Sequence, residues 1–140
     1  MIRSGFIGSL VGAIPGTGGN IAAFLSYDVT KRISKNEKVP FGEGNHKGIA
    51  SAEAGNNGVT GGALIPMLTF GIPGDSVTAI LLGALLIQGL EPGAALFTQH
   101  SATIYTIFLC LGIANTIELV VGLGLAKQFA RVATIKEYML

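Results

Sequence analysis

Two short segments combine a helix break with small polar side chains, a pattern that can bind a ligand through backbone groups. Residues 11–20 read VGAIPGTGGN and residues 69–78 read TFGIPGDSVT, so Ile-Pro-Gly interrupts an apolar stretch twice. Glycine lets the backbone approach a ligand, and the helix that follows presents free amides and a partial positive charge. This chemistry suits a carboxylate. The candidate substrate-binding residues of the first break are Gly16, Thr17, Gly18, Gly19 and Asn20.

The second break has the same glycine and proline chemistry but carries a charge. Gly74 offers backbone without a Cβ, and Ser76 is a possible helix cap, while Asp75 stands at the expected start of the next helix. An aspartate there would compete with an anionic ligand and would favour a cation. We therefore expect Gly74 and Ser76 to contact substrate and Asp75 to take part in ion coupling.

A third polar group lies between the two breaks. Glu53, Asn56 and Asn57 have the spacing i, i+3, i+4, which places them on one face of a helix. A carboxylate beside two amides can coordinate an ion or a polar substrate. A satisfied hydrogen-bond cluster between helices fits the same spacing equally well. We expect Glu53 to couple the ion, Na⁺ or H⁺, and Asn56, Asn57 and the nearby Ser51 to bind substrate.

Composition indicates a membrane protein. The 140 residues are 49% hydrophobic and 12% charged, with a mean hydropathy of +0.59, whereas soluble domains are about 25% charged. Residues 4–27 carry no charge, and residues 54–126 carry only Asp75, Glu91 and Glu118. Such segregation is what insertion into a bilayer requires. The net charge of +1 and the lack of a basic stripe with aromatics argue against a nucleic-acid partner.

The predicted fold class is an all-α membrane protein with broken or re-entrant helices plus transmembrane helices. Basic residues flank the first broken unit on both sides, at Arg3 and from Lys31 to Lys38, which favours a hairpin that enters and leaves on the cytoplasmic side. The direction of the later segments stays open. The expected elements are a broken helix unit over 5–27, a cytoplasmic loop over 28–48, a second broken unit over 49–90 and a transmembrane helix over 101–126.

Pro66 and Pro73-Gly74 are both expected to divide the second unit. Glu118 lies inside the transmembrane segment, so it should face protein or water, with pairing in the bundle or an interfacial position favoured over a transport role.

The breaks could instead be kinks whose glycines serve packing, and Gly8 and Gly12 have the small-xxx-small spacing of close helix contacts. Two breaks, each followed by small polar residues, favour a cavity site.

Catalytic chemistry has little support. The sequence contains no nucleophile–base pair and no metal-ligand spacing, and His46 and His100 are isolated. The segment GTGGN lacks the lysine and spacing of a nucleotide-binding loop. We expect no enzyme activity, no cofactor and no metal site.

The segments GAIPGTGGNIAAFLSYDVTKRISK and FGEGNHKGIASAEAGNNGVTGGALIPMLTFGIPGDSVTAILLGALLIQGLEPGAALF resemble the large membrane subunit of tripartite tricarboxylate transporters, the TctA family. The resemblance covers about residues 5–126 in order and with compatible spacing. It corresponds to the start of the second half of a longer subunit built from two related halves. It therefore implies a fragment, half of a two-repeat transporter.

The resemblance also implies a function. Members are multi-pass secondary transporters of the bacterial inner membrane, driven by an ion gradient and working with a periplasmic solute-binding protein and a small membrane subunit. Their substrates are carboxylates such as citrate. This sequence departs from the family pattern at Ala52 (usually proline), at Asp75 (usually a small residue) and at Ala94 (proline in Pro-Gly-Pro), which leaves the substrate open. The alternative is a non-transporting membrane protein that packs on a partner.

Overall fold

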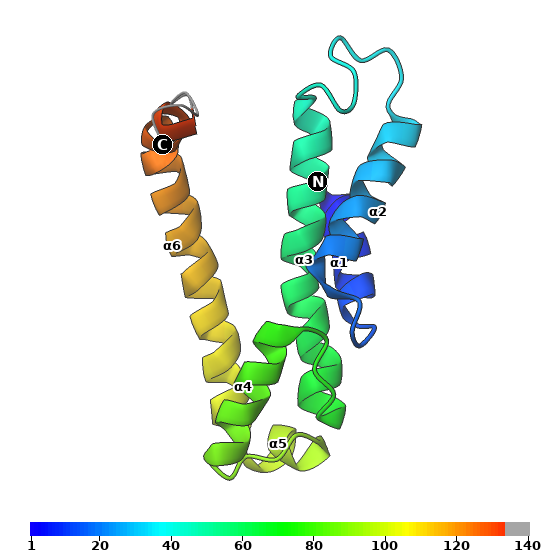
Figure 1. Ribbon diagram of the computed structural model, residues 1–140. Helices are drawn as coiled ribbons and strands as arrows, with labels where there is room; N and C mark the ends of the chain where they lie inside the picture. The colour runs from blue at the N-terminus through cyan, green and yellow to red at the C-terminus, as the bar shows by residue number, and fades with distance from the viewer. Residues whose placement is uncertain (134–140) are drawn as a thin grey trace. The chain divides into compact units, whose positions relative to one another are not determined.

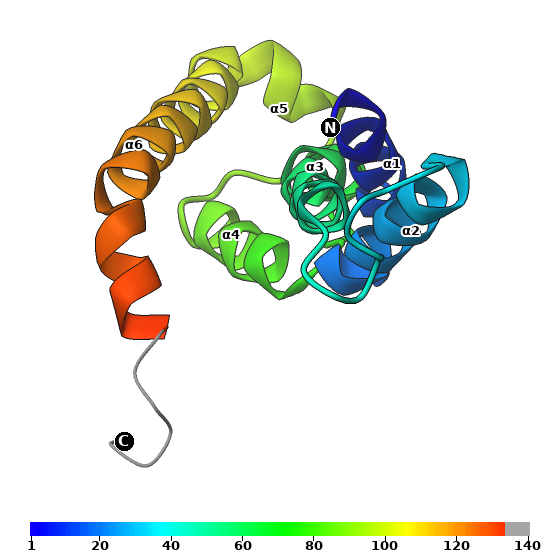
Figure 2. The same ribbon diagram turned by 90° about the horizontal axis from the view of Figure 1, so that it is seen from above.

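A computed structural model describes residues 1–133, which form helices and no strand (Figures 1 and 2). This confirms the predicted all-α class. The chain divides into two compact units, one over Met1–Gln99 and the other from His100 onward. The helices are α1 (Ile2–Gly12), α2 (Gly18–Ile33), α3 (His46–Phe70), α4 (Ser76–Ile87), α5 (Ala94–Gln99) and α6 (Ser101–Ala133).

Helix α3 is the axis of the first unit, and α1 packs on it backbone against backbone. A Cβ added to Gly8 would overlap the Gly55 carbonyl group, and one added to Gly12 would lie 2.6 Å from the Val59 carbonyl oxygen. These contacts advance in the same direction along both helices, so α1 and α3 are parallel. The close helix contact that the Gly8 and Gly12 spacing allows, noted with the packing alternative, is present.

Helix α2 packs on α3 in the opposite direction. Ser26 and the carbonyl of Ala22 lie against Gly55, while the Tyr27 ring lies over Gly48, near the start of α3. Later residues of α2 thus meet earlier residues of α3. Helices α1 and α2 therefore form a hairpin that lies along α3, as the ribbon shows (Figure 1).

The side chains of this unit are distributed as in a membrane protein. Where α1 and α2 meet α3, the interior is made largely of small residues, with Ala22 and Ser26 fully buried, while larger apolar side chains such as Met67 and Leu68 are buried toward the end of α3. Large apolar side chains point outward, with Ile2 93% exposed and Phe6 and Leu10 also exposed on the same side of α1. In water, burial of apolar groups would favour the opposite distribution. In a bilayer, small residues allow close helix packing while apolar side chains face lipid or another apolar surface.

Helix α3 continues through Pro66, which differs from the expected division there. It ends instead at Gly71, whose φ of 70° is left-handed and whose amide donates to the Met67 carbonyl at 3.0 Å. A proline inside a helix costs about 3 kcal/mol. Pro66 and the two residues after it, Met67 and Leu68, are all buried, and interior prolines are tolerated where neighbouring helices surround them.

The polar connection between α2 and α3 is shorter than the predicted loop over 28–48. Helix α2 extends to Ile33, so the loop covers residues 34–45. Asn45 begins α3, because its side-chain oxygen accepts hydrogen bonds from the amides of Lys47 and Gly48 at 2.9 and 3.2 Å. This is the usual arrangement of an asparagine N-cap.

The second unit contains α6. Among the described helices it is the one that is long and apolar enough to cross a membrane, over Ser101–Arg131 with a mean hydropathy of 2.0. It includes the whole of the predicted span over 101–126. At about 1.5 Å per residue such a helix exceeds the roughly 30 Å of a bilayer core. Glu118 is exposed on its surface.

The packing of α1 on α3 can be tested with two adjacent glycines. A Cβ at Gly62 would overlap the Ser9 carbonyl, whereas one at Gly61 would meet nothing within 4 Å. We expect Gly62→Ala to lower the free energy of unfolding by about 1–3 kcal/mol through overpacking. Gly61→Ala should be neutral or stabilising by up to about 1 kcal/mol, because alanine is the better helix former.

Unfolding of both variants in detergent, followed by circular dichroism, measures this difference. Equal stability of the two variants would contradict the described contact.

Candidate functional site: two joined helix breaks

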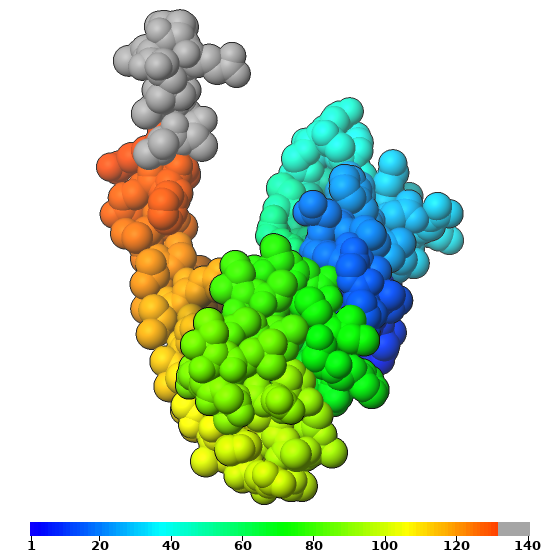
Figure 3. All heavy atoms as spheres, turned by 60° about the horizontal axis from the view of Figure 1, so that its bottom comes forward, coloured from blue at the N-terminus to red at the C-terminus, as the bar shows by residue number. Residues whose placement is uncertain are grey.

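The two Ile-Pro-Gly breaks are in direct contact. The Gly16 amide donates a hydrogen bond to the Gly74 carbonyl oxygen at 3.0 Å. Gly74 also packs so closely on α1 and α3 that an added Cβ would lie 2.8 Å from the Ala63 Cβ and 3.1 Å from the Gly12 carbonyl oxygen. In the space-filling view, green residues from the middle of the chain lie against blue residues from its N-terminal part (Figure 3). Segments far apart in the sequence thus form one junction beside α3.

The first break leaves backbone amides at the start of α2. Thr17 is the cap residue but makes no side-chain hydrogen bond to that helix. Its hydroxyl instead lies 2.6 Å from the Val11 carbonyl oxygen and 2.8 Å from that of Ile14, so it donates to the end of α1. Gly16 and Gly18 have φ of +79° and +67°, a conformation that favours glycine. The geometry leaves the α2 amides available to an acceptor such as a carboxylate.

At the second break, Asp75 caps the start of α4. Its side-chain oxygen accepts from the Thr78 amide at 2.8 Å, and the Thr78 hydroxyl accepts from the Asp75 amide at 3.0 Å. This reciprocal pair is a capping box, so the cap is Asp75 and not Ser76, which is exposed. The aspartate already occupies the position at the start of α4 where an anionic ligand would bind. The Asp-x-x-Thr spacing could have identified this cap in the sequence.

The polar face of α3 lies beside the first break. Glu53, Asn56 and Asn57 are all exposed on this helix. A Cβ on Gly19 would overlap the side-chain oxygen of Asn56, so that carboxamide touches the start of α2. Ser51 does not join this face. It is buried, and its hydroxyl donates to the Gly48 carbonyl at 2.8 Å within the same helix.

The junction also uses Ala63, a residue that the sequence did not single out. Ala63 lies where Gly74 and Gly12 meet, and unlike Gly12, which has the spacing of a close helix contact, it belongs to no recognisable motif. Because these residues are small, three backbone segments can approach one another closely. Such a role depends on which segments pack together, so no local pattern reveals it.

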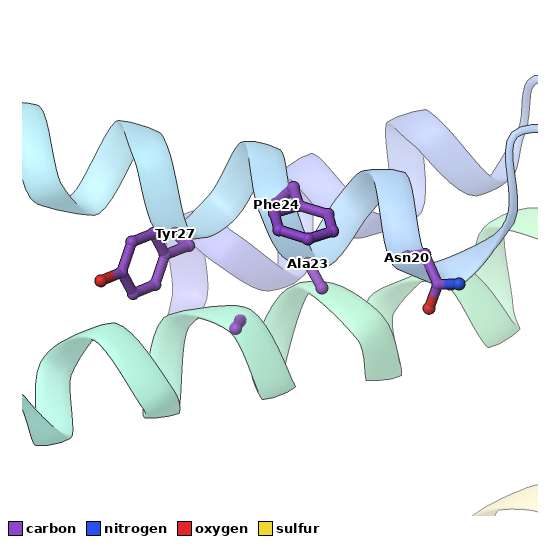
Figure 4. A pocket seen from close by; sticks show the side chains of 5 residues that line it. Asn20, Ala23, Phe24 and Tyr27 are labelled. Atoms are coloured by element: carbon purple, nitrogen blue, oxygen red, sulfur yellow. The ribbon is translucent and has the colours of Figure 1, made fainter. Parts of the chain in front are cut away.

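Asn20 lines one end of a groove between α2 and α3. A cavity of about 280 Å³ lies between α2 and α3, with mainly apolar walls. Figure 4 shows Asn20 at one end of the row of α2 side chains and Tyr27 at the other. The groove is lined by Asn20, Ala23, Phe24, Tyr27 and Ala52.

The outward apolar surface, the small-residue interior and the two discontinuous helices define an all-α membrane protein. Residues 1–140 match the Tripartite tricarboxylate transporter TctA family, and the chain belongs to that family. It is therefore a member of a transporter family whose systems have three parts. No solved structure matches the chain.

Two similar proteins come from Agrobacterium vitis. An uncharacterized protein in the TAR-II ttuC' 3' region is 38% identical over 133 residues, which cover 95% of this chain and 54% of that protein. An uncharacterized 52.8 kDa protein in the TAR-I ttuC' 3' region is 34% identical over 140 residues, which cover the whole chain and 28% of that protein. The chain thus spans about half of one relative and about a quarter of the other.

The cap at the second break can be tested by two substitutions. Asp75→Ala removes the acceptor for the Thr78 amide and should lower the free energy of unfolding by about 1 kcal/mol. Asp75→Asn keeps an acceptor of equal capping strength and should leave the stability nearly unchanged. Thermal unfolding in detergent measures both. A wild-type melting temperature for Asp75→Ala would contradict the capping role.

Proposed function

We propose that this chain is part of the membrane permease subunit of a tripartite transporter for tricarboxylates or related carboxylates. The observation that carries the proposal is the hydrogen bond between Gly16 and Gly74, which joins two helix breaks at one place. Membership of the TctA family supports the class of substrate. Discontinuous helices meet in this way at the substrate sites of secondary transporters.

The carboxylate would bind at the first break. Uncapped amides at the start of α2 supply donors, and the partial positive charge of the helix end favours an anion. The proposed substrate residues there are Gly16, Thr17, Gly18, Gly19 and Asn20. Asn56 touches Gly19 and Asn57 follows it on α3, so their carboxamides can hold further carboxylate or hydroxyl groups of the substrate.

The second break and α3 would serve the coupling ion. Glu53 and Asp75 are the carboxylates proposed to bind Na⁺ or H⁺, with Gly74 and Ser76 completing the second break. The Asp75 carboxylate caps α4 through one oxygen, Oδ1, and an ion would bind through the other. Ser51 belonged to the expected substrate set, and its hydroxyl would have to leave the Gly48 carbonyl in order to reach a ligand.

The remaining parts of the proposal concern the setting. The transporter would lie in the bacterial inner membrane as a multi-pass protein driven by an ion gradient. A periplasmic solute-binding protein would deliver the substrate, and a small membrane subunit would complete the assembly. The chain would act without a cofactor and without enzyme activity.

The substrate role of Asn57 makes a direct prediction. In the complete transporter, Asn57→Ala should abolish uptake of radiolabelled citrate or a related carboxylate while membrane insertion stays normal, because the side chain is exposed on α3 and little packing is lost. Gln88→Ala removes a carboxamide that is exposed at the end of α4, and uptake should remain.

Immunoblots of membrane fractions provide the control for insertion. Unchanged uptake by Asn57→Ala would remove this residue from the site.

A non-transporting packing protein is the second candidate. It is favoured by the exposed apolar side of α1, where Ile2, Phe6 and Leu10 could contact a partner. Uptake assays on liposomes that contain the complete transporter separate the two functions. Carboxylate uptake that needs the ion gradient supports transport, and insertion without uptake supports packing.

A further inference from the structure

The polar loop between α2 and α3 folds into a basin that the proposed transport site does not use. The basin is a cavity of about 320 Å³ with polar and apolar walls, formed by the loop and the first residues of α3. We refer to it as the loop basin. It is lined by Lys35, Asn36, Glu37, Lys38, Val39, Asn45, His46 and Lys47.

Internal contacts hold the loop basin in shape. Asn45 is buried, and its side-chain nitrogen donates to the Val39 carbonyl at 2.6 Å while its oxygen caps α3. Phe41 packs edge-on against Tyr27 of α2, with 5.5 Å between ring centroids. The loop is thereby fixed to both flanking helices. A ligand would therefore bind to a preorganised surface and would lose little affinity to ordering of the loop.

The charge of the loop basin is positive. Its one carboxylate, Glu37, is paired with Lys47, whose Nζ lies 2.8 Å from the Glu37 Oε1. The hydrogen bond and charge of Lys47 lower the pKa of Glu37, so the pair stays ionised and neutralises itself near pH 7. Lys35 and Lys38 are exposed and make no ion pair within the described residues. The basin therefore presents two cations without a counter-ion.

An apolar groove lies close to this positive basin. The cavity between α2 and α3 ends at Tyr27, and the same ring contacts Phe41 of the loop. Figure 4 shows Phe24 and Ala23 following Tyr27 along α2. A cationic basin beside an apolar groove matches a molecule with an anionic head and an apolar tail.

We propose that the loop basin binds the phosphate group of an anionic phospholipid, with an acyl chain in the groove between α2 and α3. Lys35 and Lys38 contact the phosphate, and Phe24 and Tyr27 contact the chain. The membrane setting supplies this ligand at high local concentration, and basic side chains near a bilayer attract anionic lipids. The proposal does not depend on transport, because Lys35, Lys38, Phe24 and Tyr27 are not residues of the junction of the breaks, although Asn20, at the other end of the groove, belongs to the proposed substrate set.

Lipid binding can be measured on the complete natural protein purified in a neutral detergent. Native mass spectrometry counts the phosphatidylglycerol molecules retained at increasing lipid concentration, with phosphatidylcholine and inorganic phosphate as separate additions. Wild-type protein should retain phosphatidylglycerol in preference to phosphatidylcholine. Lys35→Gln with Lys38→Gln should weaken this binding about 30-fold, the effect of two basic side chains near an anionic group.

Two further variants make the result specific. Lys31→Gln with Arg32→Gln removes two positive charges from the exposed end of α2, outside the basin, one of them paired with Asp28, whose Oδ2 lies 2.6 Å from the Arg32 Nε. This variant should leave binding within about twofold of wild type. Lys35→Arg with Lys38→Arg keeps the charge and should retain binding. Unfolding temperatures without lipid verify that all variants fold.

Three outcomes would overturn the proposal. Equal losses in the Lys31/Arg32 and Lys35/Lys38 variants would show a diffuse surface attraction. Displacement of phosphatidylglycerol by inorganic phosphate at the same concentration would show a site for a soluble anion. Equal retention of phosphatidylcholine would show that the charge plays no part.

Discussion

The contact between the backbones of α1 and α3 is the constraint on which the rest of the first unit depends. Gly8 and Gly62 have no side chains, and any Cβ there would overlap the facing helix. Within a bilayer the hydrophobic effect gives helices little reason to associate, so van der Waals contact at this distance supplies much of the attraction. The parallel packing also sets where α1 ends, because Gly12 is held beside Val59 and Ala63.

The end of α1 beside α3 brings the two irregular segments together, and this contact explains how a membrane protein can tolerate them. Unpaired amides and carbonyls are costly in hydrocarbon, and irregular backbone occurs only where protein or water surrounds it. Here the Gly16 amide bonds to the Gly74 carbonyl, and Thr17 donates to carbonyls at the end of α1. The two breaks thus satisfy part of each other's hydrogen-bonding requirement. The amides at the start of α2 receive no hydrogen bond from the side chain of the cap residue, Thr17. That helix end is therefore suitable for a ligand.

Local features of the fold could be predicted from the sequence, because their causes are local. Proline with glycine marked both breaks, and the spacing of Gly8 and Gly12 indicated close helix packing. Features that depend on tertiary contacts were not predictable. Continuation through Pro66 depends on the burial of its neighbours, and the meeting of Gly16 with Gly74 depends on the packing of three helices.

In the candidate site, too, features with local causes were predictable and features that depend on tertiary contacts were not. The shared helix face of Asn56 and Asn57 was predicted from helical spacing, whereas the burial of Ser51 was not. The cap formed by Asp75 lay within reach of sequence reasoning, since Thr78 is three residues away. Asp75 is also proposed to bind the coupling ion. The capping hydrogen bonds are compatible with that role but do not imply it.

The most direct measurement is nuclear magnetic resonance of the isotope-labelled protein in lipid nanodiscs. It tests whether the two helix breaks form one junction. We expect nuclear Overhauser contacts between the Gly16 amide proton and residues 73–75, together with slow hydrogen exchange of that amide, because it bonds to the Gly74 carbonyl at 3.0 Å. A rapidly exchanging Gly16 amide with no contact to residues 73–75 would contradict the junction and the site built on it.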